Sequence, residues 1–187
     1  MTAQKNVTPS AESLASAAKA ASKKGPPPVD KWNPPFCGDI DMRIARDGTW
    51  FYLGTPIGRK PLVKLFSSII RKDGENYFLV TPVEKVGIIV DDAPFVAIDF
   101  EVTEDGLEFV TNVDDVVTAG PDHPIRVERD PETGEPSPYV LIRRNLWALI
   151  DRKSFYRLVD LGEVEGDMFG VRSMETFFGI IPAAELE

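Results

Sequence analysis

The chain has 187 residues, of which 43% are hydrophobic, and a formal net charge of −9 at pH 7. This length and composition suffice for one sizeable hydrophobic core, or two small ones, without disulfide or metal staples. Residues 1–28 carry four lysines and one glutamate, so the rest of the chain carries −12. A body this acidic repels a phosphate backbone, so we expect no nucleic-acid partner.

The chain contains one cysteine, Cys37, and one histidine, His123. A single thiol forms no internal disulfide, and one thiol with one histidine cannot build a structural zinc site, so we expect no metal and no cofactor. No segment approaches the roughly 18 to 20 apolar residues of a membrane span, and the first thirty residues lack the apolar core of a secretory signal. We therefore expect a cytoplasmic protein with no membrane span.

The first element in chain order is an alanine-rich segment that reaches Lys24 and is then broken by Gly25 and three prolines. Alanine favours helix, but Leu14 is the only large apolar residue that this segment has to bury. The proline run favours an extended linker. We expect residues 1–30 to form a flexible, partly helical tail.

A hairpin is predicted around the turn "RDGT", because apolar residues alternate on both sides of it. The following segment, "RKPLVKLFSSIIRKDG", has helical spacing, with Pro61 suited to the first turn and Gly74 to the end. The apolar residues at positions i, i+3, i+4 and i+7 are Leu62, Leu65, Phe66 and Ile69. A helix over this segment is therefore expected.

A β-meander is predicted next, followed by a second set of similar elements. The strands of the meander are "NYFLVTP", "VGIIVD", "PFVAIDFEV" and "LEFVTNV". After the loop "DDVVTAGPDHP" come the strands "IRVERD" and "YVLIRR", a helix over "NLWALIDRKSFYRLVDLG", and the strands "DMFGVRS" and "ETFFGII". The pattern of strands and one helix thus occurs twice.

An internal repeat accounts for this second set of elements. Residues 42–47, "MRIARD", overlay residues 125–130, "IRVERD", at a shift of 83, and later matches follow at shifts of 84 and 91. We predict an α+β fold of two tandem related β-β-α-β-β units with a central β-meander. The predicted domains are the tail (1–30), an N-terminal repeat (31–91) and a C-terminal repeat (92–187).

The segments "GTPIGRKPLVKLF", "YFLVTPVEKVGIIVDDAPF", "HPIRVERD", "PYVLIRRNLWALIDRKSFYRLV" and "MFGVRSMETFFGI" resemble a bacterial family known as domain of unknown function 1285. The resemblance extends from Trp32 to Ile181. It implies a duplicated α+β core and a C-terminal half superficially like a pleckstrin homology fold. It also implies a nucleotide-like ligand between the halves and a role in signal transduction, with no established activity.

Two arginines are candidate anion-binding residues, because Arg59 precedes one predicted helix and Arg143 precedes the other. A cation at the positive end of a helix dipole is unfavourable by roughly 0.3 to 1 kcal/mol when exposed. Something negative should compensate, either a salt bridge to Glu84 or Glu175, or an anionic ligand held by the paired arginines.

We therefore predict a non-catalytic protein that binds a small anionic, nucleotide-like ligand in the cleft between the two repeats. In this prediction two arginines contact the anion, a lysine adds a second cation, a glutamate orients them, and a histidine and a third arginine lie at the rim. The predicted ligand-binding residues are Arg59, Lys85, Glu84, His123, Arg126 and Arg143.

Two alternatives remain open from the sequence. The first is a hydrolase or transferase that uses His123 with Cys37 or a carboxylate, but no recognisable motif combines nucleophile, base and orienting group. Moreover, Cys37 is expected to be a buried, inert thiol. "GTPIGRKP" lacks the spacing of a phosphate-binding loop, and the paired aspartates lack the ligand spacing of a calcium-binding loop.

The second alternative is a protein-interaction module with no ligand.

Overall fold

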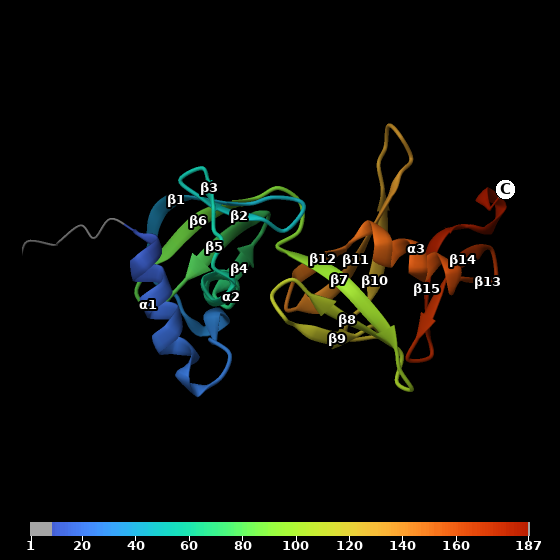
Figure 1. Ribbon diagram of the computed structural model, residues 1–187, viewed down its shortest axis with the longest axis horizontal. Coiled ribbons are helices and arrows are strands. Elements are labelled where there is room, and N and C mark those ends of the chain that lie inside the picture. The colour runs from blue at the N-terminus through green and yellow to red at the C-terminus, as the bar shows by residue number, and fades with distance from the viewer. Residues whose placement is uncertain (1–8, 187) are drawn as a thin grey trace, which may run out of the picture. The chain divides into compact units, whose positions relative to one another are not determined.

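The computed structural model describes residues 9–186 and divides into two units (Figure 1). The N-terminal unit comprises the chain up to Ala45 together with Thr49–Asp91. The C-terminal unit comprises Arg46–Gly48 and Asp92–Glu187. Three residues of the first hairpin turn therefore belong to the C-terminal unit. No helix among the described residues is long and apolar enough to cross a membrane.

The N-terminal unit contains one six-stranded sheet and two α-helices. The helices are α1 (Ala11–Ala21) and α2 (Lys60–Ser67), with 3₁₀ turns at Ser22–Lys24 and Val29–Lys31. The strands are β1 (Phe36–Ile44), β2 (Trp50–Tyr52), β3 (Thr55–Pro56), β4 (Ile70–Asp73), β5 (Asn76–Val80) and β6 (Lys85–Val90). Their order is β3-β2-β1-β6-β5-β4, in which β1 and β6 are parallel and all other neighbours antiparallel. Two three-stranded meanders are thus joined through one parallel pair.

Helix α1 is packed, which differs from the expected tail with little to bury. Ser10 caps the helix in a capping box, and Leu14 and Ala18 are fully buried. The helix packs against α2, where the small alanine side chains allow a close approach. The expectation of little burial is therefore wrong for residues 11–21, whereas residues 1–8 of the predicted tail lie outside the described residues.

Helix α2 is shorter than predicted. It ends at Ser67, and the hydroxyls of Ser67 and Ser68 donate to the carbonyls of Lys64 and Leu65, at 2.7 and 2.6 Å. Such bonds from serine to the preceding turn compete with helix continuation. The segment Ile70–Asp73 instead forms β4 and pairs with β5.

The C-terminal unit contains a second six-stranded sheet, a small third sheet and one α-helix. The strands of the large sheet are β7 (Phe95–Val102), β8 (Leu107–Thr111), β9 (Val116–Thr118), β10 (Ile125–Arg129), β11 (Pro136–Arg143) and β12 (Leu146–Ile150). Helix α3 (Arg152–Asp160) follows, then β13 (Glu163–Glu165), β14 (Met168–Ser173), β15 (Thr176–Pro182) and a 3₁₀ turn at Ala183–Glu185. The sheet orders are β10-β11-β12-β7-β8-β9 and β13-β14-β15.

The helix predicted over 145–162 is wrong in its first half. Leu146, Ala148 and Ile150 alternate with less buried residues and form β12, which pairs with β11 and β7. Asp151 then caps α3 by accepting a hydrogen bond from the amide of Ser154. Arg143 therefore precedes a strand, so the helix-dipole argument does not apply to it.

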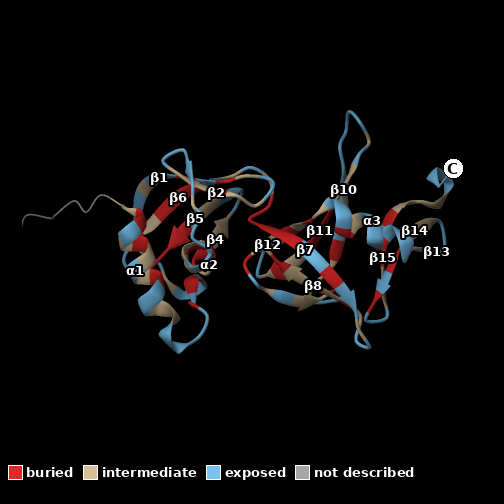
Figure 2. Ribbon diagram, in the orientation of Figure 1, coloured by how far each residue is buried: buried red, intermediate tan, exposed pale blue. Residues whose placement is uncertain are grey.

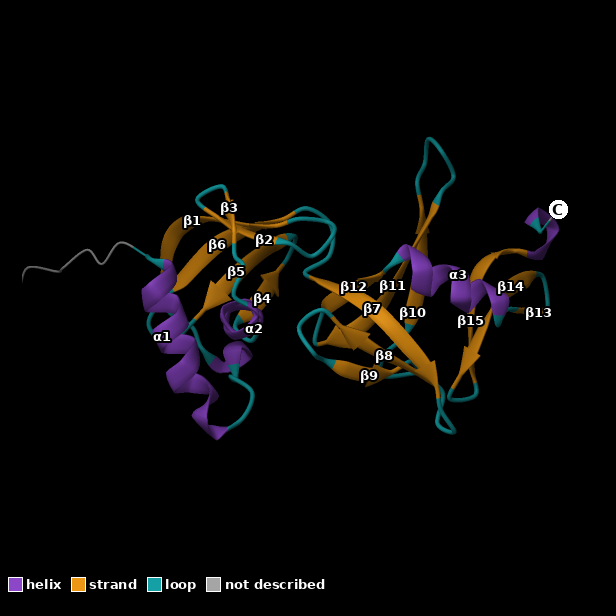
Figure 3. Cartoon of the chain, viewed as in Figure 1, coloured by secondary structure: helices purple, strands orange, loops and turns teal. Residues whose placement is uncertain are grey.

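The two large sheets have the same strand order, which confirms two tandem units of an α+β fold (Figure 3). The predicted β-β-α-β-β composition of each unit is wrong, because each large sheet has six strands and only the N-terminal sheet has a helix between its strands. In each sheet the first and sixth strands, β1 and β6 or β7 and β12, form the central parallel pair. The predicted overlay of 42–47 on 125–130 is wrong, because it sets β1 on β10, whereas the strand order matches β1 with β7. The predicted match at a shift of 84 is wrong too, because it sets residues 62–66 of α2 on residues 146–150 of β12. The pleckstrin-like likeness stays a prediction.

Both units bury apolar residues along their strands (Figure 2). In the N-terminal unit, Phe66 of α2 stacks on Trp50 of β2 with ring centroids 6.1 Å apart, and neither ring is more than 1% exposed. In the C-terminal unit, Phe100 and Phe109 pack across β7 and β8 with centroids 5.4 Å apart. Each sheet therefore has its own aromatic core.

Candidate functional site

The C-terminal unit contains a groove of about 610 Å³, within the range of small-molecule sites. It is formed by strands β7, β11 and β12, the first turns of α3 and the 46–47 turn. Its lining residues are Arg46, Asp47, Val96, Ile98, Glu135, Pro136, Ser137, Pro138, Leu149, Ile150, Asp151, Arg152, Phe155 and Tyr156.

One wall of the groove is apolar and partly aromatic. The parallel register of β12 and β7 places Leu149 beside Val96, and Ile98 follows on β7 with 38% of its surface exposed. Phe155 and Tyr156 come from the second turn of α3. Such a wall suits a ligand with a flat apolar body.

Arg46 is held at the rim by a polar network. Its Nε lies 3.0 Å from Asp92 Oδ2, and its Nη2 donates to Ser137 Oγ at 3.0 Å. The hydroxyl of Tyr139 donates to the other oxygen of Asp92 at 2.7 Å. Burial, and then the bond to Asp92, raises the pKa of Tyr139, while the bond to Asp92 raises the pKa of Arg46. Asp92 therefore holds both groups in place by accepting a hydrogen bond from each.

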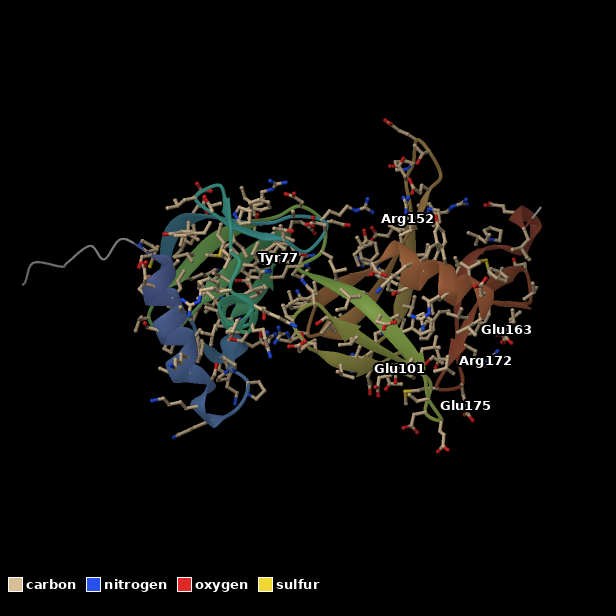
Figure 4. All side chains as sticks on the ribbon, viewed as in Figure 1. Tyr77, Glu101, Arg152, Glu163, Arg172 and Glu175 are labelled. Carbon is tan, nitrogen blue, oxygen red and sulfur yellow. The ribbon has the colours of Figure 1, made fainter. Side chains whose placement is uncertain are left out.

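Arg152, labelled in Figure 4, is the first residue of α3. Its side chain is held only weakly. Its Nη2 lies 3.4 Å from Glu135 Oε1, and the two side chains are 73% and 65% exposed. Ion pairs this exposed contribute about 0 to 1 kcal/mol. Arg152 can therefore exchange Glu135 for an anionic group of a ligand at little cost.

The predicted site residues of the N-terminal unit lie in two places, with Glu84 and Lys85 at the start of β6 and Arg59 at the start of α2. Lys85 Nζ lies 2.8 Å from Asp73 Oδ2 and 4.1 Å from the ring centroid of Phe78. Glu84 is 8% exposed, and its backbone bonds to Thr81 close the corner between β5 and β6. Arg59 is exposed at the N-cap of α2. No hydrogen bond or ion pair of the described residues joins Arg59 to the other two.

The predicted residues of the C-terminal unit all have partners within the protein. His123 Nδ1 lies 2.9 Å from the carbonyl oxygen of Leu141. Arg126 of β10 forms an ion pair with Glu128 at 3.0 Å, and its guanidinium lies over the ring of Trp147. Arg143 of β11 lies 3.6 Å from Asp115, and its guanidinium lies over the ring of Phe95.

Burial lowers the pKa of Arg143, an effect that Asp115 opposes. Binding a ligand at Arg143 would remove more water from its guanidinium group, which costs further desolvation free energy. None of the six predicted residues lines the groove. Their joint site between the repeats stays a prediction.

Cys37 is exposed, so the expectation of a buried thiol is wrong. The first four residues of β1 are not buried, and the alternation of buried residues begins only at Ile40. The Cys37 thiol lies 3.4 Å from the carbonyl oxygen of Pro35. Among residues 9–186, no group of three or more His, Cys, Asp or Glu side chains is arranged to hold a metal ion.

The sequence prediction missed the groove because it placed Phe155 in the middle of one long helix over residues 145–162. The useful signal was "LIDRKS", in which an aspartate stands three residues before a serine and ends an alternating apolar run. Aspartate is a favoured N-cap, so the helix should start there. A helix that starts at Asp151 places Arg152 on its first turn and Phe155 and Tyr156 on its second.

Two family models match the chain. The N-terminal domain of the domain of unknown function DUF1285 matches residues 27–93, and the C-terminal domain of the DUF1285 protein of unknown function matches residues 94–180. A search of curated proteins gives no match.

Two solved structures are similar to the chain. A DUF1285 family protein from Silicibacter pomeroyi DSS-3 is 59% identical, with a TM-score of 0.85, covering 92% of this chain and 97% of that one. A DUF1285 family protein from Shewanella baltica OS155 is 31% identical, with a TM-score of 0.51, covering 64% of this chain and 90% of that one. Neither description states an activity.

Proposed function

The chain belongs to the DUF1285 family, and we propose that it is a non-catalytic protein that binds a small organic ligand in the groove of its C-terminal unit. The observation that carries this proposal is the combination of a groove of about 610 Å³ with an aromatic wall and two arginines. A ligand bound there buries apolar surface against Phe155 and Tyr156 and forms charged hydrogen bonds at the rim.

The ligand class that fits best is an aromatic anion of nucleotide type. A planar base matches the wall formed by Leu149, Phe155 and Tyr156. A phosphate matches the guanidinium of Arg152, which has little to lose by leaving Glu135. Arg46, fixed by Asp92 and Ser137, offers a second positive group without reorganisation.

The charge of the C-terminal unit restricts this ligand class. The unit holds 9 basic and 22 acidic residues, a net charge of −13. A small inorganic anion is repelled by such a surface and has no apolar part to offset the repulsion. Nucleoside phosphates should therefore bind, whereas inorganic phosphate should not.

A binding role is favoured over catalysis by the chemistry of the groove. Its lining includes no histidine, cysteine or lysine. Asp151 caps α3, and the Ser137 hydroxyl accepts from Arg46, so neither forms a nucleophile and base pair. A role in signal transduction, in which the bound ligand alters an interaction of the protein, is the wider function that we propose.

The test is a thermal-shift and calorimetric screen of nucleoside mono-, di- and triphosphates, nucleosides and inorganic phosphate. A ligand at about 100 times its dissociation constant adds roughly 2.7 kcal/mol of stability. We expect Arg152→Glu and Tyr156→Ala to abolish that shift. Arg129→Glu is the matched control, because Arg129 is also an exposed arginine paired with a glutamate but does not line the groove.

Two outcomes would change the proposal. If Arg59→Ala and Arg143→Ala remove binding while Arg152→Glu preserves it, the ligand binds at the residues predicted from sequence and not in the groove. If no phosphorylated compound shifts the melting temperature, the protein is not a nucleotide binder, and the ligand-free interaction module becomes the better description.

A further inference from the structure

Four large apolar side chains are exposed within nine consecutive residues that run from the middle of α3, through its C-cap, into β13. Tyr156 is 60% exposed, Val159 37%, Leu161 48% and Val164 55%. We call these four residues the α3–β13 ridge. We treat these four residues, which lie close together in the sequence, as one apolar patch, and large exposed apolar patches on soluble proteins mark interaction sites.

The ridge is exposed although the segment that carries it is firmly attached. Leu158, which lies between Tyr156 and Val159 in the sequence of α3, is buried, with 1% of its surface exposed. Gly162 packs so closely on Phe169 of β14 that an added Cβ would lie 2.0 Å from the ring. Arg172 of β14 bonds to Glu163 at 3.1 Å and also to Glu165, which ties β13 down (Figure 4). The ridge is therefore a preformed surface, and a partner pays little ordering entropy on binding it.

The charge around the ridge selects the kind of partner. Four acidic residues, Asp160, Glu163, Glu165 and Asp167, lie within or just after this segment of the chain, and Arg172 offsets only part of their charge. Arg157, the basic residue within the ridge sequence, turns away to bond Asp99 and the carbonyl of Phe100. A positively charged partner complements this surface.

We propose that the α3–β13 ridge is a docking surface for a basic amphipathic segment of a partner protein, with large apolar side chains flanked by lysine or arginine. An anionic membrane is disfavoured, because its surface would face the same carboxylates. A symmetric contact between two ridges is disfavoured too, because it would bring two sets of four acidic residues together.

The experiment measures binding of a fluorescent 18-residue leucine/lysine helical peptide to the full chain by anisotropy, with a leucine/glutamate peptide as the negative probe. The ridge variant is Val159→Glu with Val164→Glu. The control variant is Val102→Glu with Val116→Glu, two exposed valines of β7 and β9. Both variants add the same charge, so general attraction of a basic peptide cancels between them. Tyr156 is left unchanged because it also lines the proposed ligand groove.

We expect the lysine peptide to bind at least 10-fold more weakly to the ridge variant and within 2-fold of the parent to the control variant. Equal affinities for the two variants would overturn the proposal. A concentration-dependent dimer in ultracentrifugation that only the ridge variant abolishes would also overturn it, in favour of self-association. If circular dichroism shows that either glutamate variant is unfolded, the same comparison is made with serine at the four positions.

Discussion

The two six-stranded sheets share one strand order and differ in where a helix is inserted. In the N-terminal unit, α2 lies between the third and fourth strands, and its Phe66 closes the core against Trp50. In the C-terminal unit, the same connection is the short loop 119–124, and the helix comes only after the sixth strand. The strand order therefore does not depend on a helix at a fixed place. The position of α3 leaves a groove beside β7 and β12.

The two units also differ in charge. The N-terminal unit has 12 basic and 8 acidic residues, a net charge of +4, whereas the C-terminal unit has a net charge of −13. Charge affects solubility and partner choice more than it affects the fold. Two sheets with the same strand order thus present surfaces of opposite net charge, and the proposed ligand groove and docking ridge both lie on the acidic unit.

The largest expected effect tests whether the N-terminal sheet needs α2. Phe66→Ala should cost about 3 to 5 kcal/mol, because Phe66 is fully buried and its removal leaves a cavity over Trp50. Urea unfolding measures the loss, with Val83→Ala as the control, since Val83 is 73% exposed and should change stability by less than about 0.5 kcal/mol. A loss below about 1 kcal/mol would mean that α2 is dispensable in this sheet.

A smaller effect concerns the hairpin turn between the second and third strands of each sheet. In the N-terminal sheet Leu53 has φ of +52° and is followed by Gly54, whereas in the C-terminal sheet the left-handed residue is Asp114. Leucine is strained in this region by roughly 1 to 2 kcal/mol, while asparagine and aspartate tolerate it. Because Leu53 is 64% exposed, Leu53→Asn should stabilise the protein by about 0.5 to 1 kcal/mol.

The control for this turn is Ile89→Asn, which makes a similar replacement at an exposed position of an extended strand. Asparagine is disfavoured in strands, so this variant should be destabilised or unchanged. Thermal unfolding of the two variants gives the comparison. An equal gain in both would show that the removal of exposed apolar surface, and not the relief of backbone strain, is responsible.

Much of the fold was predictable from local sequence patterns. The strands β5, β6, β7, β8 and β10 follow from β-branched and aromatic runs bounded by turn residues. The errors occurred where one apolar run fits two periodicities. Leu146, Ala148 and Ile150 satisfy both a helix and a strand, and only pairing with β7, about fifty residues earlier, decides for the strand.

The candidate site was less predictable, for a related reason. Arg143 was chosen by its charge and by its position before an expected helix, but neither reveals that Asp115 lies 3.6 Å from this arginine. The groove depends on Val96, Leu149 and Phe155, which are ordinary apolar residues in the sequence and become neighbours only through the parallel pairing of β7 and β12. Contacts of that kind are not encoded by any short motif.

The smallest expected effect is a pH dependence that belongs to the N-terminal sheet. Hydrogen bonds from Arg71 and then Lys85 lower the pKa of Asp73 below its ordinary value of 3.8. A carboxylate with a lowered folded-state pKa contributes stability above the unfolded-state value and loses it as the pH falls toward the folded-state value. Asp73→Asn should therefore lower the free energy of unfolding at pH 7 and make almost no difference near pH 2.

Asp122→Asn, which removes a carboxylate with no ion pair among residues 9–186, is the control and should leave the acid limb of the stability curve unchanged. A deficit in Asp73→Asn that persists at pH 2 would show that side-chain packing, and not the charge of Asp73, stabilises this edge of the sheet.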